Sequence, residues 1–322
     1  PRPVIPMPMT PPGKRPPAEP FDGTVSIMAW NIWHGGRHNG RDAGPDQVVE
    51  VIQDSGADIV CMQETYGSGP LIADKLNWYF VGRSSNCSVL SRFPITRTFH
   101  IWRGFHLTGA EVRLPDGRPI RAFSLWIHHL PDVGLHTWLA KPVKQMLDEE
   151  QETRGAQIAA IIGGLTRYTD ECDQIPMVVA GDFNSLSHLD WTDRNTRDGV
   201  RPVPWGVSRA MFAAGFTDAF RLVHPDAQTH PARTWSPRFP DQWQDRIDYV
   251  YTCGAVSAQD AAMIDAPVVD GALASAADDV RRALAPVQAF EDIRIMERRK
   301  GMARDVSRAF RDAVRLTKQD ER

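Results

Sequence analysis

Four short hydrophobic runs of this sequence each contain at least one carboxylate or amide side chain. They are AWNIW at 29–33, DIVCMQE at 58–64, VVAGDFN at 178–184 and DRIDYV at 245–250. A single polar residue beside a strand is more often structural than functional. Four such runs in one chain predict that the strand ends bring several polar side chains to a common site. Carboxylates gathered in this way can exchange protons or hold a cation.

In this order, the segments resemble the endonuclease/exonuclease/phosphatase superfamily. This group includes deoxyribonucleases, abasic-site endonucleases, inositol polyphosphate 5-phosphatases and bacterial sphingomyelinases. The resemblance covers about residues 22–252 and depends on WNIWHGG, DIVCMQET, SVLSRFPI, the HL of IHHL, VVAGDFN and DRIDYVY. It implies a four-layered α/β sandwich of two mixed β-sheets flanked by helices (deoxyribonuclease I-like). It also implies hydrolysis of phosphate esters with a divalent metal. WNIWHGG and SHLDWT are similar to segments of uncharacterised bacterial members.

The resemblance assigns roles to four of the polar residues. Glu64 and Asn31 correspond to metal-binding positions, and hard oxygen ligands of this kind suit Mg²⁺ (or Mn²⁺). Asn31 is also a candidate phosphate ligand. Asp182 corresponds to the carboxylate that activates the attacking water, and Asn184 to the amide that holds a phosphate oxygen. In-line displacement needs both a metal that neutralises charge in the transition state and a base that orients the water.

Two further residues follow from the same resemblance, and a third comes from the distribution of arginines. His129 corresponds to a histidine that donates a hydrogen bond to a phosphate or leaving-group oxygen. Glu111 is expected on a neighbouring strand, where it would orient His129 and raise the basicity of its imidazole. A surface charge on the strand is the alternative interpretation of Glu111. Arg246, in the DRIDYV run, is a candidate phosphate ligand.

The resemblance breaks near the C-terminal end of the predicted domain. Asp248 corresponds to a catalytic aspartate that orients a second histidine within a Ser-Asp-His triplet, but none of the ten histidines lies beyond His230. The nearest equivalent is Asp265, before the APVV run at 266–269. Asp265 either replaces the histidine as a candidate metal ligand or remains as the aspartate of the triplet. Loss of one acid–base group lowers rates by roughly 10²–10⁴-fold, so hydrolysis would be slow but feasible.

Two functions are therefore open. The first is a metal-dependent phosphoesterase, acting by metal-assisted attack of water on a nucleic acid, a phospholipid or a small phosphoester. The second is a catalytically impaired relative that binds a phosphoester ligand or a protein. The formal net charge of −3 argues against binding of nucleic acid through overall charge, but leaves a local arginine patch open. We expect a monomer. Many similar bacterial proteins are exported, which favours an extracytoplasmic location, although the chain shows no signal peptide.

Hydrophobic patterning predicts the elements that must position these side chains. Strands are expected at 24–30, 57–62, 87–90, 120–127, 177–180 and 247–251, and helices at 47–54 and 154–162. The PDG sequence at 115–117 predicts a hairpin turn between strands at 111–114 and 118–127. Hairpins mixed with helices indicate two packed sheets rather than a uniformly parallel sheet.

The 322 residues are enough for one large α/β domain with appendages. Nine of the 25 prolines fall within residues 1–20, which predicts a disordered, proline-rich lead-in at 1–21. The phosphoesterase-like domain is expected at 22–270, and a divergent, helical, arginine-rich segment at 271–322. No apolar run approaches the ~18 residues of a transmembrane helix.

Overall fold

The computed structural model describes residues 21, 23–134, 141–195, 202–235 and 244–264. All of them lie in one compact unit, Pro1–Ala266. The predicted lead-in up to residue 20, the predicted segment 271–322 and Asp265 fall outside the described residues. Within the described ranges, no helix combines the length and the hydropathy that crossing a membrane requires.

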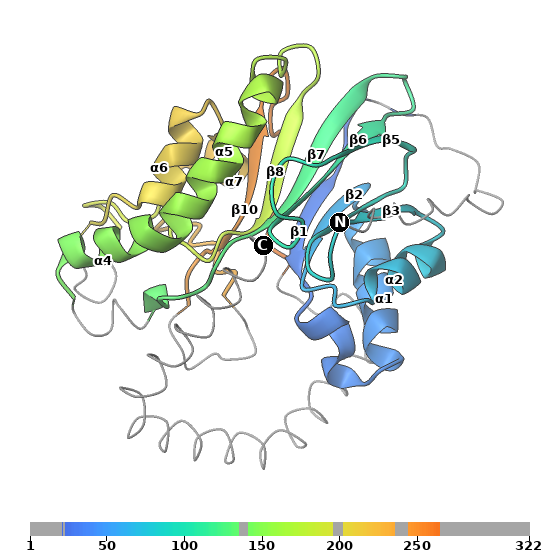
Figure 1. The fold of residues 1–322 in the computed structure, drawn as a ribbon, viewed down its shortest axis with the longest axis horizontal. Helices are drawn as coiled ribbons and strands as arrows, with labels where there is room; N and C mark the ends of the chain where they lie inside the picture. Colours follow the sequence, from blue (N-terminus) through green and yellow to red (C-terminus); the bar gives the residue numbers. More distant parts are fainter. Residues whose placement is uncertain (1–20, 22, 135–140, 196–201, 236–243, 265–322) are drawn as a thin grey trace, which may run out of the picture. The chain divides into compact units, whose positions relative to one another are not determined.

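Two mixed β-sheets form the centre of this unit (Figure 1). The four-stranded sheet has the order β1-β2-β4-β3, and the six-stranded sheet has the order β5-β6-β7-β8-β10-β9. The first contains β1 (Ile27–Asn31), β2 (Ile59–Gln63), β3 (Tyr79–Gly82) and β4 (Ser88–Ser91). The second contains β5 (Ile95–Phe99), β6 (Leu107–Arg113), β7 (Pro119–Trp126), β8 (Met177–Asp182), β9 (Thr217–Asp218) and β10 (Asp248–Cys253). The pairs β1–β2 and β7–β8 are parallel, and the other pairs are antiparallel.

Helices cover the outer face of each sheet, which gives the predicted four layers (Figure 1). The helices are α1 (Ala43–Ser55), α2 (Gly69–Leu76), α4 (Val143–Glu150), α5 (Ala156–Thr169), α6 (Gly206–Ala213) and α7 (Ala219–Val223), with a 3-10 helix at His34–Asn39 and a π-helical turn at Gln151–Gly155. On α5, Ile158, Ile161 and Leu165 recur at helical spacing and pack on the six-stranded sheet. Helices α1 and α2 cover the other sheet in the same way.

Strand β2 explains why the DIVCMQE run is so apolar. Its alternate residues face opposite sides, so Ile59 and Cys61 pack between the sheets while Val60 and Met62 pack against the helices. A strand covered on both faces needs a continuous hydrophobic run rather than an alternating one. The strands predicted at 57–62 and 177–180 are thus β2 and β8, and the hairpin predicted at 115–117 joins β6 to β7.

Gln63, at the end of β2, ties the two sheets together. Its Nε2 donates to Ser124 Oγ on β7 (2.9 Å), and that hydroxyl donates to the Met62 carbonyl oxygen (2.9 Å). Gly181 on β8 leaves room for this contact, because a Cβ there would lie 2.7 Å from Gln63 Nε2 and 2.1 Å from the Leu125 carbonyl oxygen. Gly181 also has a φ of +148°, which side chains disfavour. The glutamine of DIVCMQE and the glycine of VVAGDFN are therefore structural.

Candidate active site

Strand direction brings the predicted polar residues to one edge of the sandwich. Parallel β1 and β2 end together, with Asn31 opposite Gln63 and Glu64 following it. Parallel β7 and β8 end at Trp126 and Asp182, which are register partners. Antiparallel β10 begins at the same edge, where Asp248 lies opposite Asp182. Hydrogen bonds between residues of the two sheets then join this cluster.

Asn31 lies between two carboxylates that come from different sheets. Its Nδ2 donates to Glu64 Oε1 (3.0 Å) and to Asp182 Oδ2 (3.0 Å). This fixes the orientation of the amide, because an oxygen in that place would face two acceptors. Asn31 Oδ1 accepts a hydrogen bond from the backbone N–H of Trp33 (3.0 Å). Asn31 therefore holds the two carboxylates, and its direct contact with a metal or phosphate stays a prediction.

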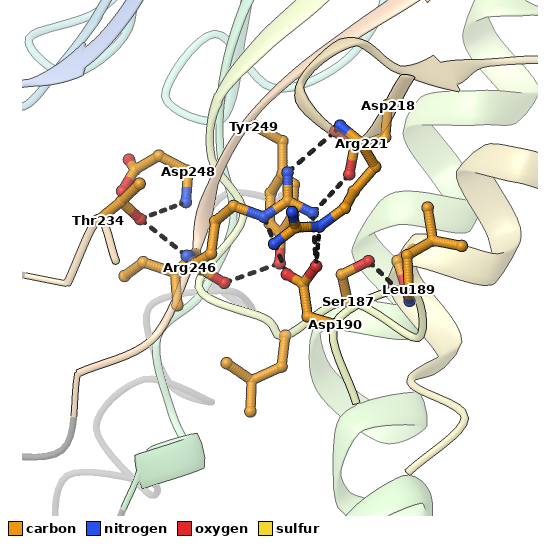
Figure 2. Close-up of polar contacts among 12 residues, drawn as sticks. Ser187, Leu189, Asp190, Asp218, Arg221, Thr234, Arg246, Asp248 and Tyr249 are labelled. Atoms are coloured by element: carbon orange, nitrogen blue, oxygen red, sulfur yellow. Dashed lines mark hydrogen bonds and ion pairs between the residues drawn. The ribbon is translucent and has the colours of Figure 1, made fainter. Parts of the chain in front are cut away.

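The cluster brings several carboxyl groups close together, and this disfavours their ionised forms. Burial raises the pKa of Asp182 to about 7, although the hydrogen bonds from Asn31 and Asn184 act in the opposite direction. Burial and the neighbouring Asp182 raise the pKa of Asp248 well above its usual value. Among the described residues, Asp248 Oδ1 is buried without a hydrogen-bond partner. The Asp248 backbone N–H donates to Thr234 Oγ1 (3.0 Å; Figure 2).

These side chains fit a hard divalent cation. Glu64, Asp182 and Asp248 offer carboxylate oxygens whose mutual repulsion a cation would relieve. In the part of the chain that the structure describes, no three or more His, Cys, Asp or Glu side chains are arranged as a ready metal cage. Magnesium does not require such a cage, since one or two protein carboxylates commonly hold it together with water.

Backbone strain gathers at the same edge. Glu64 and Asn184 have positive φ values of 54° and 45°, in a region that residues with a Cβ seldom occupy. Hydrogen bonds hold the Glu64 backbone, since its N–H donates to Asn86 Oδ1 (2.8 Å) and its carbonyl accepts from Gly35 N (2.7 Å). Such residues cluster at functional sites, where neighbouring contacts hold the strained conformation. No motif in the sequence indicated Asn86.

His129 follows β7 at the edge where Asp182 ends β8. Arg154, in the π-helical turn, donates through Nη1 to the carbonyl oxygens of His129 (3.2 Å) and Pro131 (2.8 Å). Desolvation lowers the pKa of His129, while the negative charges of Asp132 and Glu64 act in the opposite direction. A neutral imidazole at neutral pH can donate one hydrogen bond and accept another. Sequence patterning placed Arg154 in a helix but not in contact with this loop.

The expected pair of Glu111 and His129 is wrong. Strands β6 and β7 are antiparallel, so the start of β6 lies beside the end of β7, and Glu111 lies opposite Arg121 instead. Arg121 Nε is 3.5 Å from Glu111 Oε2, and Arg121 is the register partner of Met177, at the start of β8. Glu111 is thus a strand charge near the opposite end of the sheet from Asp182.

The prediction that Arg246 binds phosphate is also corrected. Its guanidinium is buried, and each of its nitrogens donates to Asp190 or Asp218 (Figure 2). The Nη2–Oδ2 distance to Asp218 is 2.6 Å, and the guanidinium carbon lies 4.5 Å from the Tyr249 ring centroid. Arg221 pairs with the same Asp190. Arg246 therefore anchors the start of β10, and every nitrogen of its guanidinium already donates to an aspartate.

Asn184 lies beside Asp182 as predicted, in a buried position. Its backbone N–H donates to Asp182 Oδ1 (2.9 Å), and its Nδ2 donates to the Ile127 carbonyl oxygen (2.9 Å). One amide hydrogen of Asn184 is therefore used within the protein, and the amide connects the ends of β7 and β8.

Comparison with known proteins gives three kinds of match. A profile described as the Endonuclease/Exonuclease/phosphatase family matches residues 28–283. An uncharacterized protein of Caenorhabditis elegans, F14F9.5, is 25% identical over 255 residues, which are 72% of this chain and 79% of that protein. TDP2 from C. elegans matches with a TM-score of 0.48 and 17% identity, over 71% of this chain and 64% of its own. An AP endonuclease from Archaeoglobus fulgidus matches with a TM-score of 0.47 and 14% identity, over 71% of this chain and 86% of its own.

Proposed function

This chain belongs to the endonuclease/exonuclease/phosphatase family, a family of hydrolases that act on phosphoesters, and we propose that it cleaves a phosphodiester with the help of a divalent metal. The main support is the position of Asn31, with Nδ2 3.0 Å from Glu64 Oε1 and 3.0 Å from Asp182 Oδ2. This contact joins carboxyl groups from both sheets into one site.

In this proposal Glu64 holds Mg²⁺ or Mn²⁺, and Asn31 keeps the carboxylates of Glu64 and Asp182 in place. The bound metal would neutralise charge on a phosphate oxygen and favour ionisation of water. Asp182 orients the attacking water and accepts its proton as the new P–O bond forms and the bond to the leaving oxygen breaks. Asn184 and His129 donate hydrogen bonds to phosphate or leaving-group oxygens, and Asp248 supports Asp182 from the adjacent strand.

The decisive experiment measures hydrolysis of bis-p-nitrophenyl phosphate, oligonucleotides and sphingomyelin with Mg²⁺ or Mn²⁺ and with EDTA. We expect activity that EDTA abolishes and that Asp182→Ala lowers at least about a hundredfold, the usual contribution of a positioned base. Asp54→Ala, on the exposed face of α1, is the matched control and should keep full activity. Activity that persists in EDTA, or is unchanged in Asp182→Ala, would contradict the proposal.

One observation favours a second function, in which the protein binds a phosphoester without turning it over. Asp248 Oδ1 lacks a partner among the described residues, and the sequence has no histidine beyond His230 to orient. For this alternative we expect micromolar or tighter binding of a phosphoester and no turnover. Metal-dependent turnover that His129→Ala abolishes would exclude it.

A further inference from the structure

A row of aromatic rings leads away from His129 along the edge of the candidate site. The Trp126 ring centroid lies 6.1 Å from that of His129, 5.8 Å from that of His106 and 5.6 Å from that of Phe105. The Trp102 ring lies 5.1 Å from His106 at the far end of the row. We call Trp102, Phe105, His106 and Trp126 the aromatic platform. Phe105 is 38% exposed, and the other three rings are half-buried.

The loop that carries three of these rings is joined directly to the backbone of Glu64, the candidate metal ligand. Asn86, which is buried, accepts the Glu64 backbone N–H through Oδ1 (2.8 Å) and donates through Nδ2 to the Phe105 carbonyl oxygen (2.9 Å). Ser84 Oγ donates to the Gly104 carbonyl oxygen (3.0 Å), and His106 Nδ1 lies 3.0 Å from the Trp126 carbonyl oxygen. One buried amide thus fixes the platform relative to Glu64.

The chemistry of the platform suits flat, neutral ligand groups. Burial lowers the pKa of His106, which favours its uncharged ring, and that ring packs between those of Trp102 and Trp126. The Arg103 guanidinium lies 5.7 Å from the Trp102 ring centroid, which adds one positive charge at the far end. Aromatic faces with an arginine beside them are the common means of binding bases of single-stranded nucleic acid.

We propose that the aromatic platform stacks the bases of a single-stranded nucleic acid whose phosphodiester lies at the candidate site. The inference rests on the proposed function and narrows its substrate class. Double-stranded nucleic acid would not serve, because its base faces are covered by neighbouring base pairs.

The test compares a short oligothymidylate with an oligomer of equal length built from base-free deoxyribose phosphate. The full chain with Mg²⁺ should show a kcat/KM about tenfold higher or more for the oligothymidylate, since stacking on one aromatic ring has an effect of this order. Phe105→Ala should raise KM for the oligothymidylate about tenfold without changing cleavage of the base-free oligomer. Phe212→Ala, on α6 and 65% exposed, is the matched control and should change neither.

Base stacking on the platform would be contradicted by equal kcat/KM values for the two oligomers, or by an equal loss of kcat/KM for both in Phe105→Ala. Either result would leave the proposed hydrolysis intact. If neither oligomer is cleaved, the platform is judged from fluorescence anisotropy of labelled oligomers, and the proposed function is judged separately from hydrolysis of bis-p-nitrophenyl phosphate. In that assay, binding of the base-free oligomer as tight as that of the oligothymidylate would also contradict base stacking on the platform.

Oligouridylate in place of oligothymidylate shows whether the protein prefers RNA or DNA. A larger effect of Phe105→Ala on sphingomyelin vesicles than on oligothymidylate would assign the platform to lipid.

Discussion

Asn31 determines whether Glu64 and Asp182 can remain close together. Each carboxylate receives one hydrogen of the same amide, so a single neutral side chain offsets part of their repulsion. A carboxylate at position 31 would remove both donors and add another negative charge. Removing a donor that serves a buried charged acceptor is costly, because the acceptor is left without its partner.

We therefore expect Asn31→Asp to lower the free energy of unfolding by about 2 kcal/mol or more in EDTA. Urea unfolding followed by circular dichroism measures this change. Added Mg²⁺ should restore part of the loss, because a cation neutralises the added charge. Gln53→Glu, which adds one negative charge on the exposed face of α1, serves as the control. A loss of equal size in the control would mean that overall charge, rather than the bridge at Asn31, is responsible.

Single residues also show where sequence reasoning succeeds. Glu64 and Asp182 could be placed at the site because each follows directly from the end of a buried strand, and the direction of parallel strands settles the rest. Glu111 could not be placed correctly, because its partner depends on the register between β6 and β7. The phosphate-binding role predicted for Arg246 is wrong because its guanidinium pairs with Asp190 and Asp218. Both aspartates are distant in sequence, so a local motif does not reveal these ion pairs.

At the scale of elements, α4, the π-helical turn and α5 form one long helix. This helix supports the loop after β7, which carries His129, and the loop after β8, which carries Ser185. Arg154 donates to the backbone around His129, and Glu150 accepts hydrogen bonds from Ser185 Oγ and from the Gly206 N–H (2.6 Å). π-helical turns within α-helices frequently occur at functional sites. The sequence predicted a helix at 154–162 but not this turn, because the turn follows from the contacts of Glu150 and Arg154.

Glu150 makes the stability of this element depend on pH. Burial raises its pKa, although the hydrogen bonds and Arg154 oppose this shift. A raised pKa in the folded state means that the protonated carboxyl stabilises the fold below the ordinary pKa near 4.5, and that this contribution is lost as the pH rises through the raised value. In the structure Glu150 accepts from both Ser185 Oγ and the Gly206 N–H, whereas a glutamine would accept from Gly206 with its oxygen and could donate to the Ser185 hydroxyl with its NH₂ group.

We expect Glu150→Gln to unfold at a higher urea concentration than the native protein at pH 8, with the difference shrinking toward pH 5. Urea denaturation curves of both proteins at several pH values measure this difference in midpoint. Glu152→Gln, on an exposed position of the same turn, should show no such trend. A Glu150→Gln variant that is less stable at every pH would show that the ionised carboxylate is stabilising, through Arg154 and its hydrogen bonds.

At the scale of the whole described unit, the candidate site depends on how the two sheets meet. Asn31 and Glu64 belong to one sheet, while Asp182 and Asp248 belong to the other. Their distances are fixed by the contact of Gln63 with Ser124, which Gly181 makes possible one residue before Asp182. The four-layered fold could be predicted from the order of motifs, whereas this contact could not, because it requires the distance between sheets.

Gly181→Ala tests that dependence directly. The added methyl group would lie 2.1 Å from a backbone oxygen, which cannot move aside as a flexible side chain could. We expect a loss of about 3 kcal/mol or more in the free energy of unfolding, together with loss of phosphodiesterase activity, because Asp182 must shift with the strand. Gly163→Ala in α5, where a Cβ has nothing within 4 Å, should instead stabilise the protein by about 0.5–1 kcal/mol and leave activity unchanged.

A Gly181→Ala protein as stable and active as the native one would contradict this expectation. It would mean that the sheets can move apart without disturbing the carboxylates. The positions of Glu64 and Asp182 would then be held by the hydrogen bonds of Asn31 alone.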